Sequence, residues 1–265
     1  MLDLWPRLEC PIYATPFTAV TEPATANRVK QDKFTYRIGA NYVSVDGIAP
    51  YISYSTSFEP VLGVNSATLD AFKPSTGRQW EAGVKYDARG LSPDIRLFAT
   101  AALFEIRQKN VVTTTPSTGP VFGTQSGRVR VRGGELELVA RIRDQLSING
   151  SYSYNRSKVL ESDVLAEIGA ELPTTPRHKA SLCVNYNVQR GALAGLGLGA
   201  GARYTSSSAG SLPLDPSIFN PTPVPVIRGE ASTLVDAIVS YDIPGWRFAV
   251  NGSNILDERY VARCS

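Results

Sequence analysis

Apolar and polar side chains alternate with a two-residue period along much of this chain. In the segment 79–88 the even positions are Trp80, Ala82, Val84 and Tyr86, and the odd positions between them are polar or glycine. Such alternation predicts a β-strand with one apolar face. The pattern occurs in ten segments, which cover residues 33–43, 48–58, 79–88, 94–106, 127–142, 145–155, 177–188, 195–206, 231–242 and 246–254.

The connections between these segments alternate strictly in length. The short ones are 44–47, 89–93, 143–144, 189–194 and 243–245, and the long ones are 59–78, 107–126, 156–176 and 207–230. Bacterial outer-membrane barrels have short periplasmic turns, long extracellular loops and strands that alternate apolar-out and polar-in, with aromatic residues at both membrane interfaces. Aromatic residues lie near many of the segment ends, among them Tyr42, Phe58, Trp80, Tyr86, Tyr154, Tyr204, Tyr241 and Trp246. The pattern therefore predicts an all-β, antiparallel, transmembrane outer-membrane β-barrel in contact with outer-membrane lipid.

Composition narrows the possible functions. The 27 basic and 24 acidic residues leave a net charge of +3 without a strongly basic block, so nucleic acid is not expected as a partner. The least polar stretch, 191–202, is too short and too rich in glycine for a transmembrane helix. Residues 1–20 contain charges and prolines and no apolar core of a secretory signal, so no export signal is expected in the chain as given.

Candidate chemistry is sparse. Cys10, Cys183 and Cys264 are too scattered for a disulfide framework or a zinc site, and His178 is the one histidine. We therefore expect no metal site and no cofactor.

Catalytic alternatives are weaker than structural ones. Glu135 and Glu137 share one face of a strand, but solvated carboxylates paired with cross-strand bases such as Arg141 or Lys85 are a simpler interpretation than acid–base catalysis. No serine motif or orienting acid accompanies His178, which is expected near the mouth of the barrel. The glycine-rich run 195–201 lacks the features of a nucleotide-binding loop and fits a strand with small lumen-facing residues. We expect no enzyme activity and predict no catalytic residue.

Several stretches resemble the C-terminal barrel of TonB-dependent siderophore receptors. They are 49–62 (APYISYSTSFEPVL), 77–86 (GRQWEAGVKY), 131–138 (VRGGELEL), 176–182 (PRHKASL), and 232–242 (STLVDAIVSYD) followed by 251–262 (NGSNILDERYVA). The resemblance implies about ten strands of a larger, plugged barrel of about 22 strands. It also implies uptake of a ferric siderophore in the outer membrane, driven in a full-length parent by the TonB complex.

The resemblance suggests a division of the chain. Residues 1–32 would be a loop remnant, and residues 33–265 the C-terminal portion of the barrel without its last strand. By the same resemblance Cys264 would lie in the last extracellular loop. The aromatic residues that could contact a siderophore are Tyr54, Phe58, Phe72, Phe122 and Tyr204, none of which is singled out as a binding site.

Two alternatives remain open at this point. One is a small outer-membrane barrel that closes on itself with about ten strands and acts as a porin or a barrel enzyme. The other is a soluble secreted β protein that uses its long loops for recognition.

Overall fold

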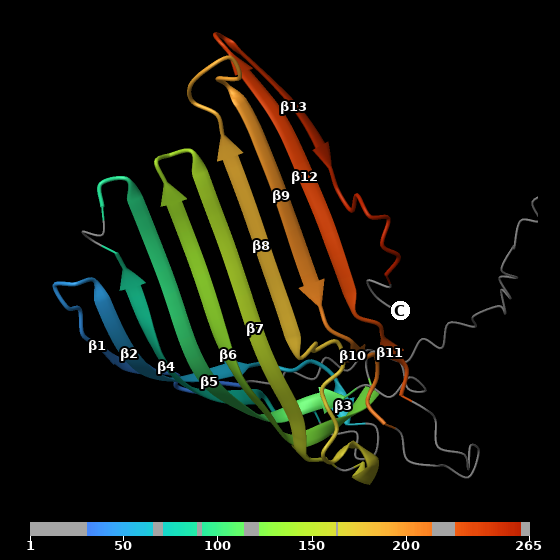
Figure 1. Ribbon diagram of the computed structural model, residues 1–265. Helices are drawn as coiled ribbons and strands as arrows, with labels where there is room; N and C mark the ends of the chain where they lie inside the picture. The colour runs from blue at the N-terminus through green and yellow to red at the C-terminus, as the bar shows by residue number, and fades with distance from the viewer. Residues whose placement is uncertain are drawn as a thin grey trace, which may run out of the picture. The chain divides into compact units, whose positions relative to one another are not determined.

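The computed structural model describes residues 31–65, 71–88, 92–113, 122–162, 164–213 and 226–260. Its main feature is one antiparallel sheet with the strand order β1-β2-β4-β5-β6-β7-β8-β9-β12-β13 (Figure 1). These strands are β1 (Arg37–Asn41), β2 (Ile48–Glu59), β4 (Ser75–Asp87), β5 (Ile95–Thr113), β6 (Phe122–Ile142), β7 (Leu146–Glu161), β8 (His178–Asn187), β9 (Leu196–Thr205), β12 (Ser232–Ile243) and β13 (Trp246–Gly252). Each strand pairs with its neighbour along the chain, as in an up-and-down barrel wall.

Three short strands lie outside this path. β3 (Val64–Asn65) pairs with β6 in parallel, while β10 (Ser208–Ala209) and β11 (Arg228–Gly229) form a separate two-stranded pair. A single turn of 3-10 helix, η1 (Leu165–Glu167), lies in the connection from β7 to β8. Within the described residues, no helix has the length and apolarity needed to cross a membrane.

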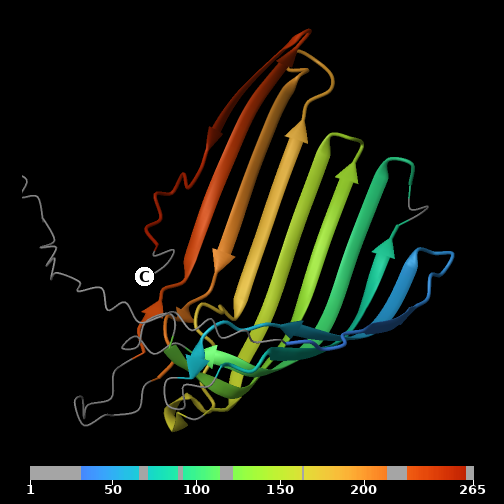
Figure 2. The same cartoon turned by 180° about the vertical axis from the view of Figure 1, so that it is seen from behind.

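The short connections gather at one end of the sheet and the long ones at the other (Figures 1 and 2). The turn between β6 and β7 shows why the short ends can be tight. Arg143 and Asp144 have φ values of 51° and 52°, and the amide of Gln145 donates to the carbonyl of Ile142 at 3.0 Å. Two successive residues with positive φ match the twist of the flanking strands and are typical of two-residue hairpins.

The ten predicted strands are confirmed, but four of them are longer than predicted at the end with the long loops. β4 starts at Ser75, β5 continues to Thr113, β6 starts at Phe122 and β7 continues to Glu161. The connection predicted over 107–126 is therefore mostly strand. The loop remnant predicted over 1–32 lies almost entirely outside the described residues, and so do Cys10 and Cys264.

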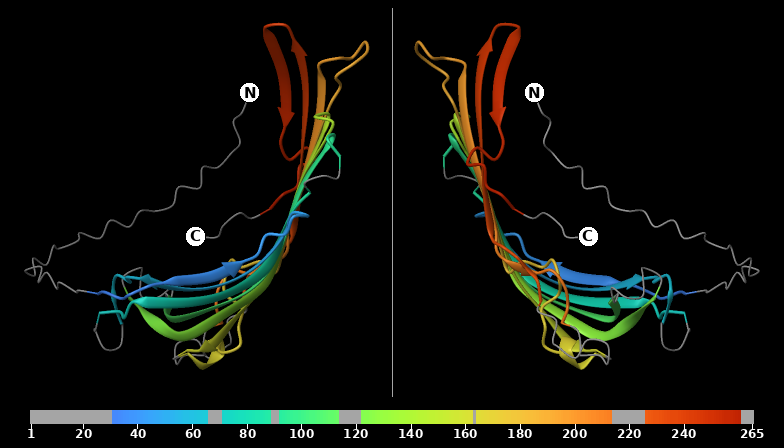
Figure 3. Two further views of the ribbon diagram at one scale, coloured as in Figure 1. Left: turned by 90° about the vertical axis from the view of Figure 1, so that its left-hand side faces the viewer. Right: turned by 90° about the vertical axis from the view of Figure 1, so that its right-hand side faces the viewer.

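The sheet is curved and open. Its two faces are concave and convex (Figure 3), and within the described residues β1 pairs only with β2 and β13 only with β12. The structure thus does not show the ten-strand barrel closed on itself.

The sheet has almost no core of its own. Phe72, Val129 and Val159 are among the few buried apolar side chains of the described residues, whereas Leu182, Val239 and Val250 are 51%, 50% and 76% exposed. Such extensive exposed apolar surface requires a non-aqueous partner.

Candidate functional site

The strand register assigns every paired residue to one of the two faces. Residues directly opposite each other on paired strands point to the same side of a sheet, and the next residues along the strand point to the other. One continuous row across seven strands consists of Tyr51, Gly83, Ala102, Glu135, Ser153, Lys179 and Thr205. This row and the parity that it defines form the polar face of the sheet.

The polar face is the concave one. A hollow of about 750 Å³ that extends from β2 to β9 is lined mostly by residues of this parity, which places them on the inner side of the curvature. Its charged lining residues are Glu81, Lys85, Glu135, Glu137, Lys179 and Arg203. The inner wall therefore presents both signs of charge to an aqueous space.

Tyr51 contacts three residues of the neighbouring strand β4 on this wall. Its hydroxyl donates a hydrogen bond to Oε1 of Glu81 at 2.7 Å, and Nζ of Lys85 lies 5.4 Å from the centre of its ring. The ring lies across Gly83, where an added Cβ would be 2.7 Å from ring carbon Cε1. The glycine thus leaves room for an aromatic side chain to lie flat against the sheet.

The convex face carries an apolar band between two sets of aromatic residues. At the long-loop end the rings of Tyr54 and Trp80 lie 4.7 Å apart, and the Tyr152 hydroxyl is 2.8 Å from Nδ1 of His178. At the short-turn end the corresponding residues of this parity include Tyr86, Tyr186, Tyr241 and Trp246. We name the set at the long-loop end the outer aromatic belt and the set at the short-turn end the inner aromatic belt.

The spacing of the belts fits a membrane. Tyr186 and His178 are eight residues apart on β8, which corresponds to a height of roughly 21 Å at about 3.4 Å per residue and a strand tilt of about 40°. The apolar band of an outer-membrane barrel is about 25 Å tall. The convex face is therefore the lipid-facing side, and the long loops are at its extracellular end.

Of the sequence-predicted ligand aromatics, only Tyr204 borders the concave hollow among the described residues. Tyr54, Phe58 and Tyr204 have the parity of the convex face, and Phe72 is buried. The side chain of Phe122 lies outside the described residues. The aromatic side chains that do line the hollow from the concave parity are Tyr51 and Phe98, which sequence reasoning missed. A signal was present, because both are aromatic residues on the polar parity of their strands.

The other sequence candidates have structural surroundings. His178 belongs to the outer aromatic belt, where its ring is 5.2 Å from that of Tyr154. Glu135 and Glu137 lie on the concave face as expected, but no ion pair joins either to Lys85 or Arg141 in the part of the chain that the structure describes. Cys183 is exposed on the same face. No group of three or more potential metal-ligating side chains occurs among the described residues.

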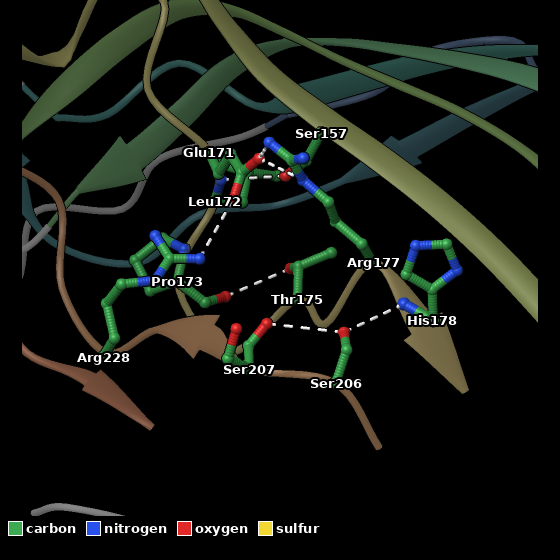
Figure 4. Close-up of polar contacts among 10 residues, drawn as sticks. All are labelled: Ser157, Glu171, Leu172, Pro173, Thr175, Arg177, His178, Ser206, Ser207 and Arg228. Atoms are coloured by element: carbon green, nitrogen blue, oxygen red, sulfur yellow. Dashed lines mark hydrogen bonds and ion pairs between the residues drawn. The ribbon is translucent and has the colours of Figure 1, made fainter. Parts of the chain in front are cut away.

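Two long connections are held together above the extracellular end by Glu171. Its carboxylate accepts from Nε of Arg177 at 2.6 Å and lies 3.6 Å from the guanidinium of Arg228 in β11 (Figure 4). The amide of Thr174 donates to the carbonyl of Ala209 at 2.8 Å, and the hydroxyl of Ser206 accepts from the amide of His178 at 3.0 Å. These contacts fix the β7–β8 connection against the segment that follows β9.

A polar concave wall, an apolar convex band between two aromatic belts, and long loops at one end define an integral outer-membrane β-barrel, of which the chain forms a wall of ten strands. Comparison with protein families matches residues 13–255 to the family described as TonB dependent receptor-like, beta-barrel. The chain belongs to this family.

Known relatives agree with this assignment. The chain is 34% identical over 245 residues to the ferrichrome outer membrane transporter/phage receptor of Escherichia coli K12, which covers 91% of the chain and 30% of the relative. It is 32% identical over 229 residues to the ferrioxamine B receptor of Salmonella typhimurium, and this match covers 84% of the chain and 30% of the relative. The chain thus spans about a third of the length of each of these two relatives.

Solved structures show the same wall. The ferric-catecholate import receptor Fiu of Escherichia coli K12 superposes with a TM-score of 0.66 at 28% identity, over 86% of this chain and 31% of that one. The ferripyoverdine receptor of Pseudomonas aeruginosa superposes with a TM-score of 0.69 at 23% identity, over 87% and 30%.

Proposed function

We propose that the chain forms part of the barrel of an outer-membrane receptor that imports a ferric siderophore. The observation that carries the proposal is the opposition of the two faces, since the charged concave wall could line a passage while the convex band contacts lipid. The names of the relatives support a siderophore as cargo, because they include receptors for ferrichrome and ferrioxamine B.

The two open edges support a larger barrel. β1 and β13 each leave one side without a partner strand in the described residues. Unpaired backbone groups in lipid cost several kcal/mol each, so such edges must be paired by further strands. A wall of about ten strands joined to others would form the wide, plugged barrel that the family resemblance implies. Energy for import would then come from the TonB complex, and the wall itself would carry no catalytic centre.

A chimaera tests this proposal. The chain replaces the matching part of the Escherichia coli ferrichrome transporter, and the product is examined for insertion into the outer membrane and for heat-modifiable migration in electrophoresis. We expect insertion, together with growth on ferrichrome or another ferric siderophore as the iron source. The same chimaera in a strain without TonB is the control and should not grow.

Two results would count against the proposal. A chimaera that does not reach the outer membrane would contradict the barrel assignment. A chimaera that inserts but supports growth on none of the siderophores ferrichrome, ferrioxamine B or a ferric catecholate would contradict the cargo.

A further inference from the structure

A hollow of about 430 Å³ lies at the short-turn end of the sheet. Residues of the β4–β5, β6–β7 and β8–β9 connections line it, together with one residue each from β5 and β6. Of its nine lining residues, eight have polar or charged side chains. Four arginines and two aspartates give the lining a net charge of +2; they are Arg96, Arg141, Arg143, Arg190, Asp94 and Asp144. We name this hollow the inner rim pocket.

The inner rim pocket belongs to the concave face of the sheet. Arg96 and Arg141 lie directly opposite each other on β5 and β6, and both have the parity of the polar face. The residue that follows Arg141 lies in one row with Tyr186 of the inner aromatic belt. The two arginines are therefore at the height of the inner belt but on the opposite side of the wall, where they face the aqueous space and not the lipid.

Three of the four arginines are not neutralised by an acidic side chain. Arg143 pairs with Asp94 at 3.4 Å. Arg96, Arg141 and Arg190 are exposed and form no ion pair within the part of the chain that the structure describes. The Cα atoms of Arg96 and Arg141 are roughly 5 Å apart as cross-strand neighbours, and like charges directly opposite each other destabilise a sheet. An anion bound between them would remove this repulsion.

A second hollow at the same end of the sheet has balanced charge. Its volume is about 360 Å³, and it shares Gln189 with the inner rim pocket. The cation in its lining, Arg247, pairs at 3.4 Å with the carboxylate in its lining, Asp242. The excess of positive charge therefore distinguishes the inner rim pocket from the hollow beside it.

Backbone hydrogen bonds between the turns hold the inner rim pocket in place. The amide of Arg143 donates to the carbonyl of Asp94 at 2.7 Å, which joins the β6–β7 connection to the β4–β5 connection. The amide of Asn187 donates to the carbonyl of Gln145 at 2.8 Å, which joins the β6–β7 connection to β8. A site whose backbone is fixed in advance loses less conformational entropy when a ligand binds. The arginines thus extend from a preorganised frame.

We propose that the inner rim pocket binds a small polyanion that carries two or more carboxylate or phosphate groups. The guanidinium of arginine donates two parallel hydrogen bonds to either kind of group, so Arg96, Arg141 and Arg190 supply three points of attachment. The volume of about 430 Å³ lies in the usual range of small-molecule sites, about 300–1,000 Å³. Only the source of the ligand, the lumen or the periplasm, rests on the proposed orientation; binding itself requires neither transport nor a siderophore.

The test is isothermal titration calorimetry of the 265-residue chain in a non-ionic detergent. The carboxylate probes are propane-1,2,3-tricarboxylate, glutarate and butyrate, which carry successively fewer carboxylates, and the phosphate probes are pyrophosphate and orthophosphate. We expect affinity to fall roughly fivefold with each carboxylate removed, to be higher for pyrophosphate than for orthophosphate, and to weaken with added salt. Binding of neither the tricarboxylate nor pyrophosphate, or equal affinity for the tricarboxylate and butyrate, would overturn the proposal. Where both polyanions bind, the tighter one identifies the preferred group.

Two variants and a matched control locate the site. The variant Arg96→Gln/Arg141→Gln/Arg190→Gln removes the three cations that have no acidic partner among the described residues. An exposed ion pair contributes up to about a fivefold effect, so we expect affinity for the preferred polyanion to fall roughly a hundredfold. The variant Arg96→Lys/Arg141→Lys/Arg190→Lys keeps the charge but loses the paired donors, and it should have intermediate affinity. The control Arg78→Gln/Arg130→Gln/Lys158→Gln removes three cations from the convex face at the opposite end and should bind as the unmodified chain does.

The remaining outcomes are separable. Unchanged affinity in the glutamine variant, or an equal loss in the control, would overturn the assignment of the site. If circular dichroism shows that the glutamine variant is unfolded, the lysine variant and the probe series decide the question. A peptide of alternating Asp and Gly that binds more tightly than the small polyanions would replace them with a protein segment as the ligand. Because binding is measured in detergent without a siderophore, a negative result here is distinct from failure of the chimaera to insert or to transport.

Discussion

An arginine at the middle of the apolar band gives the sharpest test of which face meets lipid. Leu182 on β8 is four residues from Tyr186 and four from His178, which places it about 10 Å in height from each aromatic belt at about 3.4 Å per residue and a tilt of about 40°. Its side chain is 51% exposed on the convex face. Cys183, the next residue, is exposed on the concave face. The pair offers the same substitution at the same depth on opposite sides.

The expected difference is large. Arginine at the bilayer midplane on the lipid side of a barrel costs about 2–4 kcal/mol, so Leu182→Arg should lower the free energy of unfolding by that amount. Cys183→Arg places the same charge in an aqueous space and gives up only a weak contact from Asn185 at 3.5 Å. Exposed substitutions of this kind usually change stability by less than about 0.5 kcal/mol.

The assay is equilibrium denaturation of the chimaera in phospholipid vesicles, followed by tryptophan fluorescence. An equal loss of stability in both variants, or a larger loss in Cys183→Arg, would contradict the assignment of the convex face to lipid. Ser240, another residue of the polar parity, is a poor control because it is only 5% exposed.

Three further predictions concern topology, the loop contacts and a close approach on the inner wall. An epitope inserted at 163–167 should bind antibody on intact cells, while one at Asp144 should bind only after permeabilisation, because the long loops are extracellular. Glu171→Gln should weaken the contact between the two long connections by about 1 kcal/mol, raising hydrogen exchange of the β10 and β11 amides roughly fivefold. Gly83→Ala should lower the free energy of unfolding by about 1–3 kcal/mol, because its Cβ would be 2.7 Å from the ring of Tyr51.

Each of these has a control within the same chain. Labelling of the Asp144 epitope on intact cells would reverse the orientation of the wall. Glu230→Gln changes charge equally but lies outside the Glu171 contacts, and it should leave exchange in β10 and β11 unchanged. Gly150→Ala places its Cβ 3.6 Å from the nearest atom, an ordinary contact, and should be neutral where Gly83→Ala is not.

The sequence was sufficient for the number, order and facing of the strands within the membrane, since lipid on one side and water on the other impose a constant parity. The sequence was insufficient beyond the outer aromatic belt, because there the outward-facing positions are charged and some inward-facing positions are apolar. There Arg107 and Arg130 point outward, whereas Val129 and Val159 point inward and are buried. A search for one continuous apolar face therefore ends too early in β5, β6 and β7.

The candidate site was predicted less completely for a related reason. Tyr54 and Tyr204 were named as aromatic residues that could contact a siderophore, but aromatic residues near the strand ends with the apolar parity belong to the membrane interface. The inward aromatic residues Tyr51 and Phe98 could have been found from parity alone. The contacts of Glu171 could not, because they join segments far apart in the sequence that contain no periodic pattern.

The reversal of polarity at the outer aromatic belt gives the wall a single stable depth. A displacement of the sheet toward the periplasm by one residue pair would carry Arg132 and Arg156 into hydrocarbon, at a cost of about 1 kcal/mol or more for each side chain near the interface. A displacement in the opposite direction would expose the outer edge of the apolar band to head groups and water. The change of polarity along the strands therefore also resists forces directed along the membrane normal, and it holds the barrel wall at a fixed depth in the bilayer.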